Sequence, residues 1–256
     1  MITTKTKEEI AILREGGRIH AQIMRDLVSM VKPGISAKEL NDKANDLISK
    51  QGDRAAFLSY KPKGSRRPYP ASLCVSINDE VVHCIPNEAD KILNEGDIVS
   101  LDLGLIHKGL VTDMALTVPV GEISLELKIL LETTKQALAA GIKAAKGGKK
   151  TGDIGNAIER VALSHKYGVV EELAGHGVGY SVHEDPYIPN YGEVGKGEIL
   201  KPGMVIAIEP MFNLGTKNVI LDKDDYTYRT ADGKPSAHFE HTVVITKNDA
   251  EILTEL

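Results

Sequence analysis

The chain has 256 residues, 42% of them hydrophobic, and its formal net charge is -5. This composition supplies a core for one domain near the upper size limit and excludes a generally basic nucleic-acid-binding protein, and no apolar run reaches the roughly 18 residues of a membrane helix. A charged N-terminus and two cysteines without paired spacing predict a reduced, cytoplasmic protein with neither an export signal nor a disulfide framework.

Helices and short apolar strands follow one another along the chain. Thr6 with Glu9 and Ser36 with Glu39 fit the capping box, in which each side chain satisfies an orphan backbone donor. They predict a helix that stops before Pro33 and a second one over about 36–52. Further helices are expected over 124–146 and 151–167, strands over 72–78, 97–106, 110–118, 203–209 and 241–246, and a polar hairpin over 216–237. Because helices and hairpins segregate, an α+β fold is favoured over a parallel α/β fold.

Two pairs of segments resemble each other. "VKPGISAKELNDKANDLI" (31–48) is similar to "AKGGKKTGDIGNAIERVA" (145–162), and "ILNEGDIVSLDLG" (92–104) to "ILKPGMVIAIEPM" (199–211). In the second pair Asp102 falls on Glu209. The sequence therefore predicts a single domain over 1–256 with half-repeats over roughly 1–120 and 121–256, each offering a carboxylate from an equivalent strand.

Two aspartates stand in the apolar stretch 98–118, "IVSLDLGLIHKGLVTDMALTV". If His107 and Lys108 form the loop of a hairpin, Asp102 lies directly opposite Asp113, at about 5 Å between Cβ atoms. Like charges in this position destabilise a sheet, so a cation is expected between them. A lysine would serve, but one divalent metal ion neutralises both carboxylates. The alternative is a solvated strand face with two aspartates.

Three further residues extend this acidic set. Glu209 ends the apolar run of "MVIAIEPMF", Glu240 begins the strand of "SAHFEHTVVIT" between His238 and His241, and His176 lies in "GHGVGYSVHEDP". Either glutamate alone is more typical of an exposed strand end. Together with the two aspartates they form an oxygen-rich donor set with one imidazole, which suits Mn, Fe(II) or Co, and zinc less exclusively. Four carboxylates would over-neutralise one ion, so two ions are expected.

The chain resembles the type I methionine aminopeptidases, metallopeptidases of the pita-bread fold. The matching motifs are "SINDEVVHCIP" (76–86), "DIVSLDLG" followed by Asp113, "GHGVGYSVHEDP", "AIEPM" and "HFEHT". Their order agrees with the family over nearly the whole chain. The resemblance implies two pseudo-symmetric halves with a curved antiparallel sheet covered by helices.

The resemblance also implies a ligand set for two divalent cations per subunit, which would be Co, Mn, Fe or Zn. Asp102 and Asp113 would bind the first ion, with Asp113 bridging to the second. His176 and Glu209 would bind the second ion, and Glu240 would bridge both.

The implied reaction is the removal of the N-terminal methionine from nascent proteins, with preference for a small second residue. Glu209 would double as the proton shuttle. His183 and His83 would contact the substrate and stabilise the oxyanion. His176 and His183 are an odd number of positions apart and would face opposite ways on a straight strand, but the glycines around them permit a bend.

The methionine pocket would be apolar. The resemblance maps it to Tyr60, Tyr69, Cys74 and Met211. The usual pocket tryptophan is missing, since the chain has none, and Tyr226 is expected in its place. Tyr60 and Tyr69 bound a stretch that is longer than the corresponding loop in the best-known bacterial members.

That stretch carries a basic loop at 61–67. Its Lys61, Lys63, Arg66 and Arg67 either form a solvated loop or make a transient contact with ribosomal RNA. The remaining expectations are nascent-chain N-termini as partners, no membrane, no specific nucleic acid and a monomer.

Four residues are interpreted as having no catalytic part. Cys84 replaces the glycine that commonly follows the first substrate histidine, and a packed thiol is favoured over a soft-metal ligand. His20 and His165 are expected at helix surfaces or boundaries, and His107 is expected to be exposed in a hairpin turn.

Three other functions compete with this interpretation. X-Pro dipeptidases and aminopeptidases have a similar site but usually carry an extra N-terminal domain. A type II methionine aminopeptidase would show a long helical insertion in the second half. A binding protein derived from the family would have lost metal ligands, whereas all five positions here hold an acid or a histidine.

Overall fold

An antiparallel sheet with strands from both ends of the chain forms the centre of this computed structural model, which describes residues 2–62 and 64–255. The strands are β1 (Arg54–Ala55), β2 (Leu73–Ile77), β3 (Glu80–Val82), β4 (Ile98–His107), β5 (Leu110–Pro119), β6 (Gly168–Val169), β7 (Gly175–Gly177), β8 (Glu184–Ile188), β9 (Val205–Ile208), β10 (Met211–Asn213), β11 (Val219–Leu221), β12 (Tyr228–Thr230), β13 (Ser236–His238), β14 (Glu240–Ile245) and β15 (Ala250–Ile252). The central sheet has the order β1-β4-β5-β14-β9-β7-β8, with β2 on β4 and β15 on β14.

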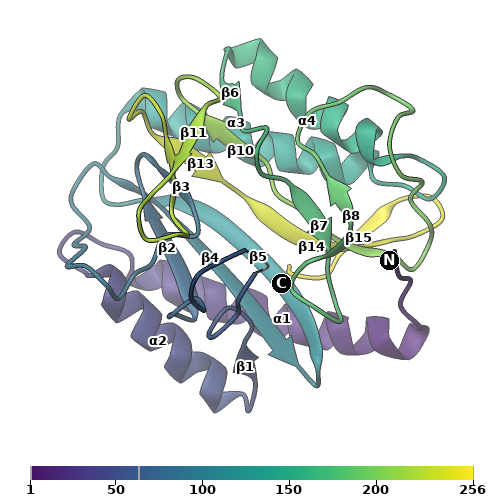
Figure 1. The fold of residues 1–256 in the computed structure, drawn as a ribbon, viewed down its shortest axis with the longest axis horizontal. Coiled ribbons are helices and arrows are strands. Elements are labelled where there is room, and N and C mark those ends of the chain that lie inside the picture. The colour runs from purple at the N-terminus through teal and green to yellow at the C-terminus, as the bar shows by residue number, and fades with distance from the viewer. Residues whose placement is uncertain (1, 63, 256) are drawn as a thin grey trace.

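Four helices pack against this sheet: α1 (Lys7–Met30), α2 (Ala37–Lys50), α3 (Leu125–Ala144) and α4 (Thr151–His165). Both predicted capping boxes are present, at Thr6 and at Ser36. Helices α1 and α2 contact β2, β4 and β5, whereas α3 and α4 contact strands of the second half such as β8, β9 and β14. Figure 1 shows the first pair along the bottom of the view and the second pair along the top. The predicted α+β class is confirmed.

Each helix pair buries its own apolar cluster. Leu27 of α1 and Leu40 of α2 meet Leu101 of β4 in the first cluster. Leu138 of α3 and Ile158 of α4 belong to the second, which also takes in strands β9 and β14. Full burial of such a side chain contributes about 1.5–3 kcal/mol relative to exposure. The two clusters pack the helices against the sheet that carries the acidic residues.

Two isolated bridges join equivalent points of the repeated segments. Ser36 pairs with Ile92, and Lys150 pairs with Ile199, both in antiparallel fashion. Ser36 and Lys150 precede corresponding helices, and Ile92 and Ile199 begin corresponding strand segments. These contacts agree with the expected half-repeats, and the division into two halves stays a prediction.

The register of the β4–β5 hairpin differs from the predicted one by two residues. Asp102 is opposite Ala115, and Asp113 is opposite Gly104. The turn is formed by Lys108 and Gly109, whose φ angles are 48° and 86°. A two-residue hairpin turn of this type needs positive φ at both positions, which glycine adopts easily. The aspartates therefore lie diagonally, and a shift by two leaves both on one face of the sheet.

Two histidines predicted near the surface are buried, which corrects that expectation. His20 is fully buried on α1, and its Nδ1 lies 3.0 Å from Oγ1 of Thr112. His107 closes β4 instead of entering the turn, and its ring contacts the carboxylate of Asp53 at 2.9 Å. Its Cβ packs so closely on α1 that a Cβ at Gly16 would lie 2.7 Å away. His165 is exposed as predicted.

Two small three-stranded sheets complete the fold, β13-β10-β6 and β11-β12-β3. The second contains the expected polar hairpin as β11 and β12. Strand β12 also pairs with β3, which precedes His83, and no sequence pattern predicts this pairing. In the described part of the chain, each helix falls short of the length or apolar character that crossing a membrane requires.

Candidate metal centre and substrate cavity

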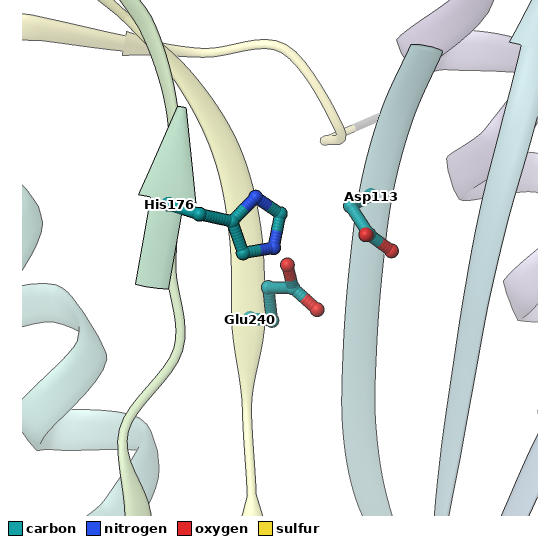
Figure 2. Close-up of side chains that lie close together, drawn as sticks. All are labelled: Asp113, His176 and Glu240. Atoms are coloured by element: carbon teal, nitrogen blue, oxygen red, sulfur yellow. The ribbon is translucent and has the colours of Figure 1, made fainter. Parts of the chain in front are cut away.

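The five expected ligands lie on five neighbouring parts of the central sheet. Asp102 is on β4, Asp113 on β5, His176 on β7 and Glu240 at the start of β14, while Glu209 directly follows β9. All five are buried. Figure 2 shows Asp113, His176 and Glu240 pointing toward one another from three separate strands. Sheet pairing, and not sequence proximity, brings these side chains together.

The donor atoms are close enough to share an ion. One ligand atom each from Asp113, His176 and Glu240 lie within 4.8 Å of one another. Donors bound at about 2.0–2.6 Å to one ion have separations in this range. Oε1 of Glu209 is 3.3 Å from Nε2 of His176. Oδ1 of Asp102 and Oε1 of Glu240 are buried without a hydrogen-bond partner. Because buried carboxylates need a cation or a proton, this donor set fits a divalent metal ion.

Burial dominates the electrostatics of the acids. It raises the pKa of Asp102 to about 7, with the neighbouring Glu209 adding to the shift and His238 opposing it. Burial likewise raises the pKa of Glu209 to about 8. The pKa values of Asp113 and Glu240 lie well above the ordinary range, first because of burial and then because other carboxylates of the cluster face them. A bound cation would reverse these shifts by favouring the charged forms.

His176 has the protonation state of a metal ligand. Burial lowers the pKa of its imidazole to about 3, so the ring is neutral at pH 7. Its Nδ1 lies 2.9 Å from the carbonyl oxygen of Gly177. A carbonyl only accepts, so Nδ1 carries the proton and donates. The lone pair of Nε2, the atom that faces Glu209, is then free to bind a metal ion.

A cavity of about 810 Å³ lies over the acidic cluster, and its wall includes all five expected ligands. The expected substrate residues Tyr60, Tyr69, Cys74, His83 and His183 line it too, together with Tyr226. Met211 does not. It is fully buried behind the wall in a cluster with Val81, Val82 and Val170, because β10 directs it into that layer.

The two substrate histidines reach the cavity from different sides. The ring of His183 stands edge-on to that of His176, with 4.4 Å between centroids, and its Nδ1 is 2.8 Å from the hydroxyl of Tyr60. His83 follows β3 with a φ of 60° and lies edge-on to Tyr228. Burial lowers the pKa of both histidines, to about 3 for His83. Both rings are therefore neutral at pH 7, and each carries one N–H group.

Tyr69 and Tyr226 form the apolar side of the cavity. Their rings meet edge-on with 5.1 Å between centroids. The hydroxyl of Tyr69 donates to the carbonyl of Cys84 at 2.9 Å, so its ring has a fixed orientation. Cys74 pairs across the sheet with Asp102, which places a small sulfur side chain between the acids and the tyrosines. Aromatic rings with a thiol suit a thioether side chain.

His238 is a residue that sequence reasoning left out of the site. It is buried, its Nε2 lies 3.6 Å from Oε2 of Glu209, and neither ring nitrogen has a hydrogen-bond partner. Burial lowers its pKa to about 4, although Asp102 opposes this shift. The signal was available: His238 and Glu240 are two residues apart on an extended segment, so they share a face.

Cys84 lies outside this centre. It is fully buried and contacts the ammonium group of Lys91, which also binds Oε1 of Glu80 at 2.6 Å. A resident lysine cation beside the thiol opposes a second cation there. The packed-thiol interpretation is therefore favoured over soft-metal binding.

Comparisons with known proteins agree with this geometry. Residues 11–247 match the model of metallopeptidase family M24. Methionine aminopeptidase 1 of Bacillus subtilis is 45% identical over 256 residues, which cover 100% of both chains. The crystal structure of methionine aminopeptidase from Rickettsia prowazekii superposes with a TM-score of 0.95 at 39% identity and full coverage of both chains. Prolidase from Pyrococcus furiosus gives a TM-score of 0.76 at 25% identity, and this chain covers 65% of it.

The fold is thus the pita-bread fold, as predicted, and the chain is a metal-dependent hydrolase. The full-length identity to aminopeptidases, against partial coverage of the prolidase, disfavours the X-Pro alternative. The chain belongs to metallopeptidase family M24 and, within it, to the methionine aminopeptidases.

Proposed function

We propose that this protein hydrolyses the first peptide bond of nascent polypeptides and releases their N-terminal methionine. The observation that carries the proposal is the convergence of Asp113, His176 and Glu240 in the wall of a cavity that also exposes the imidazoles of His83 and His183. A metal-binding cluster beside neutral N–H donors is suited to hydrolysis of an amide.

The proposed cofactor is a pair of divalent cations, with Mn, Fe(II), Co or Zn as candidates. Asp102, Asp113, His176, Glu209 and Glu240 would together hold these ions. Four carboxylates carry four negative charges, which two divalent ions balance. When bound, such ions polarise the scissile carbonyl and lower the pKa of a water molecule toward about 7.

The chain's own residues then supply proton transfer and charge stabilisation. Glu209 lines the cavity beside the other expected ligands, and its carboxylate would take up the proton that the attacking water molecule releases. It would pass this proton to the leaving amine. The N–H groups of neutral His183 and His83 would donate to the carbonyl oxygen as it gains negative charge. One such donor is commonly worth about 10²–10³ in kcat.

The pocket would be the apolar wall formed by Tyr60, Tyr69, Cys74 and Tyr226. A thioether fits such a wall and a charged side chain does not. Since the α-amine and the scissile bond must both fit beside the acidic cluster, a small second residue is expected. Met211 is omitted from the proposed pocket because other side chains separate it from the cavity.

The proposed partners are nascent-chain N-termini, in the cytoplasm, and the proposed state is a monomer. A ribosome contact through the basic loop is weakened by the pairing of its arginines. Arg66 pairs with Asp225, and Arg67 binds Oε2 of Glu88 at 2.7 Å. Such pairs neutralise charge that phosphate contacts would use. Lys61 is exposed, and Lys63 lies outside the described residues.

The deciding experiment compares hydrolysis of Met-Ala-Ser, Leu-Ala-Ser and Ala-Pro-Gly by metal-free protein and after addition of Mn, Fe(II) or Co. Metal-dependent release of methionine alone is expected. Cleavage mainly of Ala-Pro-Gly would move the protein to the X-Pro branch. Absence of cleavage with every metal, in protein shown to be folded, would revive the binding-protein alternative.

A further inference from the structure

The segment that carries His183 lacks strand pairing of its own. It lies in the bend between β7 and β8, at residues 178–183. A backbone link from Val111 to the carbonyl of Gly179 at 2.7 Å ties the start of this bend to β5. The end of the bend, where His183 stands, leads into β8, where Glu184 pairs with Gly177. Side chains of the N-terminal arm at residues 3–5 add further contacts there.

Glu184, the neighbour of His183, forms hydrogen bonds with both the bend and the N-terminal arm. One carboxylate oxygen accepts the backbone N–H groups of Tyr180 and Ser181, the second of these at 3.0 Å. The other oxygen accepts the hydroxyl of Thr3 at 2.8 Å and the ammonium of Lys5 at 2.7 Å. The carboxylate therefore closes the bend on itself and joins it to the arm.

Lys5 is an unusually enclosed lysine. Its side chain is 1% exposed, and that of Glu184 is 10% exposed. The ammonium lies 4.2 Å from the centroid of the Tyr180 ring, an attractive cation–π arrangement. The hydroxyl of Tyr180 in turn donates to the carboxylate of Glu9 at 2.9 Å. Lysine is almost never buried unless it is paired. The burial of Lys5 therefore depends on its ion pair with Glu184.

The arm is itself anchored, and the bend fits it closely. The backbone N–H of Lys5 donates to the carbonyl of Gly203 at 2.8 Å. A Cβ at Gly179, where φ is 136°, would lie 2.4 Å from Cε of Lys5. Only glycine permits that approach. Burial raises the pKa of Glu184, but the hydrogen bonds from Lys5 and Thr3 outweigh it and hold this pKa below its ordinary value.

We infer that Lys5 and Glu184 are positioning residues for the reaction: their buried ion pair holds the bend so that the imidazole of His183 faces the scissile carbonyl. The inference rests on the proposed function, because it assigns the arm a task in that chemistry. Displacing a donor by about 1 Å costs about 10²-fold in rate in comparable sites. Glu184 directly follows His183 in the chain, so a shift of its carboxylate acts on the backbone that carries His183.

The test uses the full chain with Lys5→Met, Glu184→Gln, the double variant and the conservative Lys5→Arg. Lys7→Met is the matched control, because Lys7 is exposed at the start of α1. With Met-Ala-Ser and saturating Mn, kcat is expected to fall about 10–100-fold in both single variants, with KM changed less than about twofold. The double variant should be no worse than the poorer single variant, since both remove one interaction. Lys5→Arg should restore most of kcat, and Lys7→Met should keep all of it.

Two readouts separate positioning from general stability. Amide exchange of Tyr180 and Ser181 should quicken in the single variants, while Mn affinity stays within about twofold. Unchanged kcat at a temperature well below unfolding would overturn the inference, as would a loss carried wholly by KM. Inactive wild-type protein would instead sink the proposed function. In that case unchanged amide exchange of Tyr180 and Ser181 in the single variants would refute the role of the ion pair in holding the bend. Faster exchange would support that role.

Discussion

Glu209 and His176 face each other in the candidate metal centre, with Oε1 of the carboxylate 3.3 Å from Nε2 of the imidazole. His176 of β7 and Glu209, which follows β9, thus direct a neutral nitrogen lone pair and a carboxyl oxygen toward each other. The other oxygen of Glu209 points toward His238 at 3.6 Å. Glu209 is therefore held between two imidazoles while its acidity is set by burial.

The first prediction concerns proton transfer by this carboxyl. Glu209→Gln keeps the shape of the side chain but cannot take up and release a proton. We expect kcat on Met-Ala-Ser to fall by about 10²–10⁴ at saturating Mn. Glu132→Gln, at an exposed carboxyl on α3 outside the cavity wall, is the control and should leave kcat unchanged. Steady-state kinetics with metal analysis of each preparation decides it, and equal kcat in both variants would refute the assignment.

The second prediction gives Asp113→Asn opposite effects on metal-free stability and on activity. Asp113 is buried against Asp102 and Glu209, and burial and these neighbours raise its pKa. Removing one charge from the cluster should raise the free energy of unfolding of metal-free protein at pH 8. We expect a gain of roughly 1–2 kcal/mol, which corresponds to a shift of about one unit in the pKa of a carboxyl. Mn binding and hydrolysis should be lost at the same time.

Urea unfolding in EDTA and titration calorimetry with Mn measure these two effects. Asp46→Asn, at an exposed position on α2, is the control and should change neither. Near-wild-type turnover of a folded, metal-replete Asp113→Asn protein would contradict the ligand assignment.

The third prediction is that stabilisation by metal grows with pH. The pKa of Asp102 is raised to about 7 and that of Glu209 to about 8, chiefly by burial, whereas unfolded carboxyls titrate near 4. Between pH 4 and 8 the folded metal-free state therefore binds more protons than the unfolded state, and its stability falls as pH rises. A bound cation favours the ionised acids and removes this loss.

We expect the difference in Tm between Mn-loaded and EDTA-treated protein to be larger at pH 8 than at pH 6. Calorimetry in buffers of different ionisation enthalpy should also show proton release on Mn binding at pH 7. A Tm difference that is constant over this range, with no proton release, would count against the raised pKa values.

The fourth prediction concerns acid stability and His20, which is remote from the acidic cluster. Burial lowers the pKa of His20 to about 3, opposed by a hydrogen bond with the backbone of Leu103. The unfolded histidine titrates near 6.5, so below that pH the unfolded state binds the extra proton. Stability due to neutral His20 is therefore complete above about pH 6.5 and is lost as pH falls toward 3.

His20→Gln removes this one titration. The difference in unfolding free energy between wild type and variant should shrink by up to about 1.4 kcal/mol per pH unit between pH 6 and 4. His165→Gln, at an exposed histidine on α4, should show no such trend. A wild-type advantage that stays constant over this range would mean that His20 is not buried in its neutral form.

Local signals in the sequence were sufficient for most of the fold. The capping boxes at Thr6 and Ser36 depend on residues within one helical turn, so they were predictable and are present. The hairpin of Asp102 and Asp113 was predicted as a hairpin with the wrong turn. The choice between His107-Lys108 and Lys108-Gly109 depends on which two residues adopt positive φ.

Side-chain environments made by distant segments were the harder part. No local sequence pattern predicts the contact of His20 with Thr112 or the contact of His107 with Asp53. Met211 follows the "AIEP" motif closely, yet β10 turns it away from the cavity. Such outcomes depend on how sheets pack, which no local pattern contains.

The strand order of the central sheet has a consequence for how the protein is made. β14 carries Glu240 and lies between β5 and β9, so a late segment of the chain fills the middle of the sheet. A partly synthesised chain therefore lacks the strand between β5 and β9 that carries Glu240. Glu240 can join Asp113 and His176 only after β14 has been synthesised and has paired with β5 and β9, so this three-residue cluster forms late in synthesis.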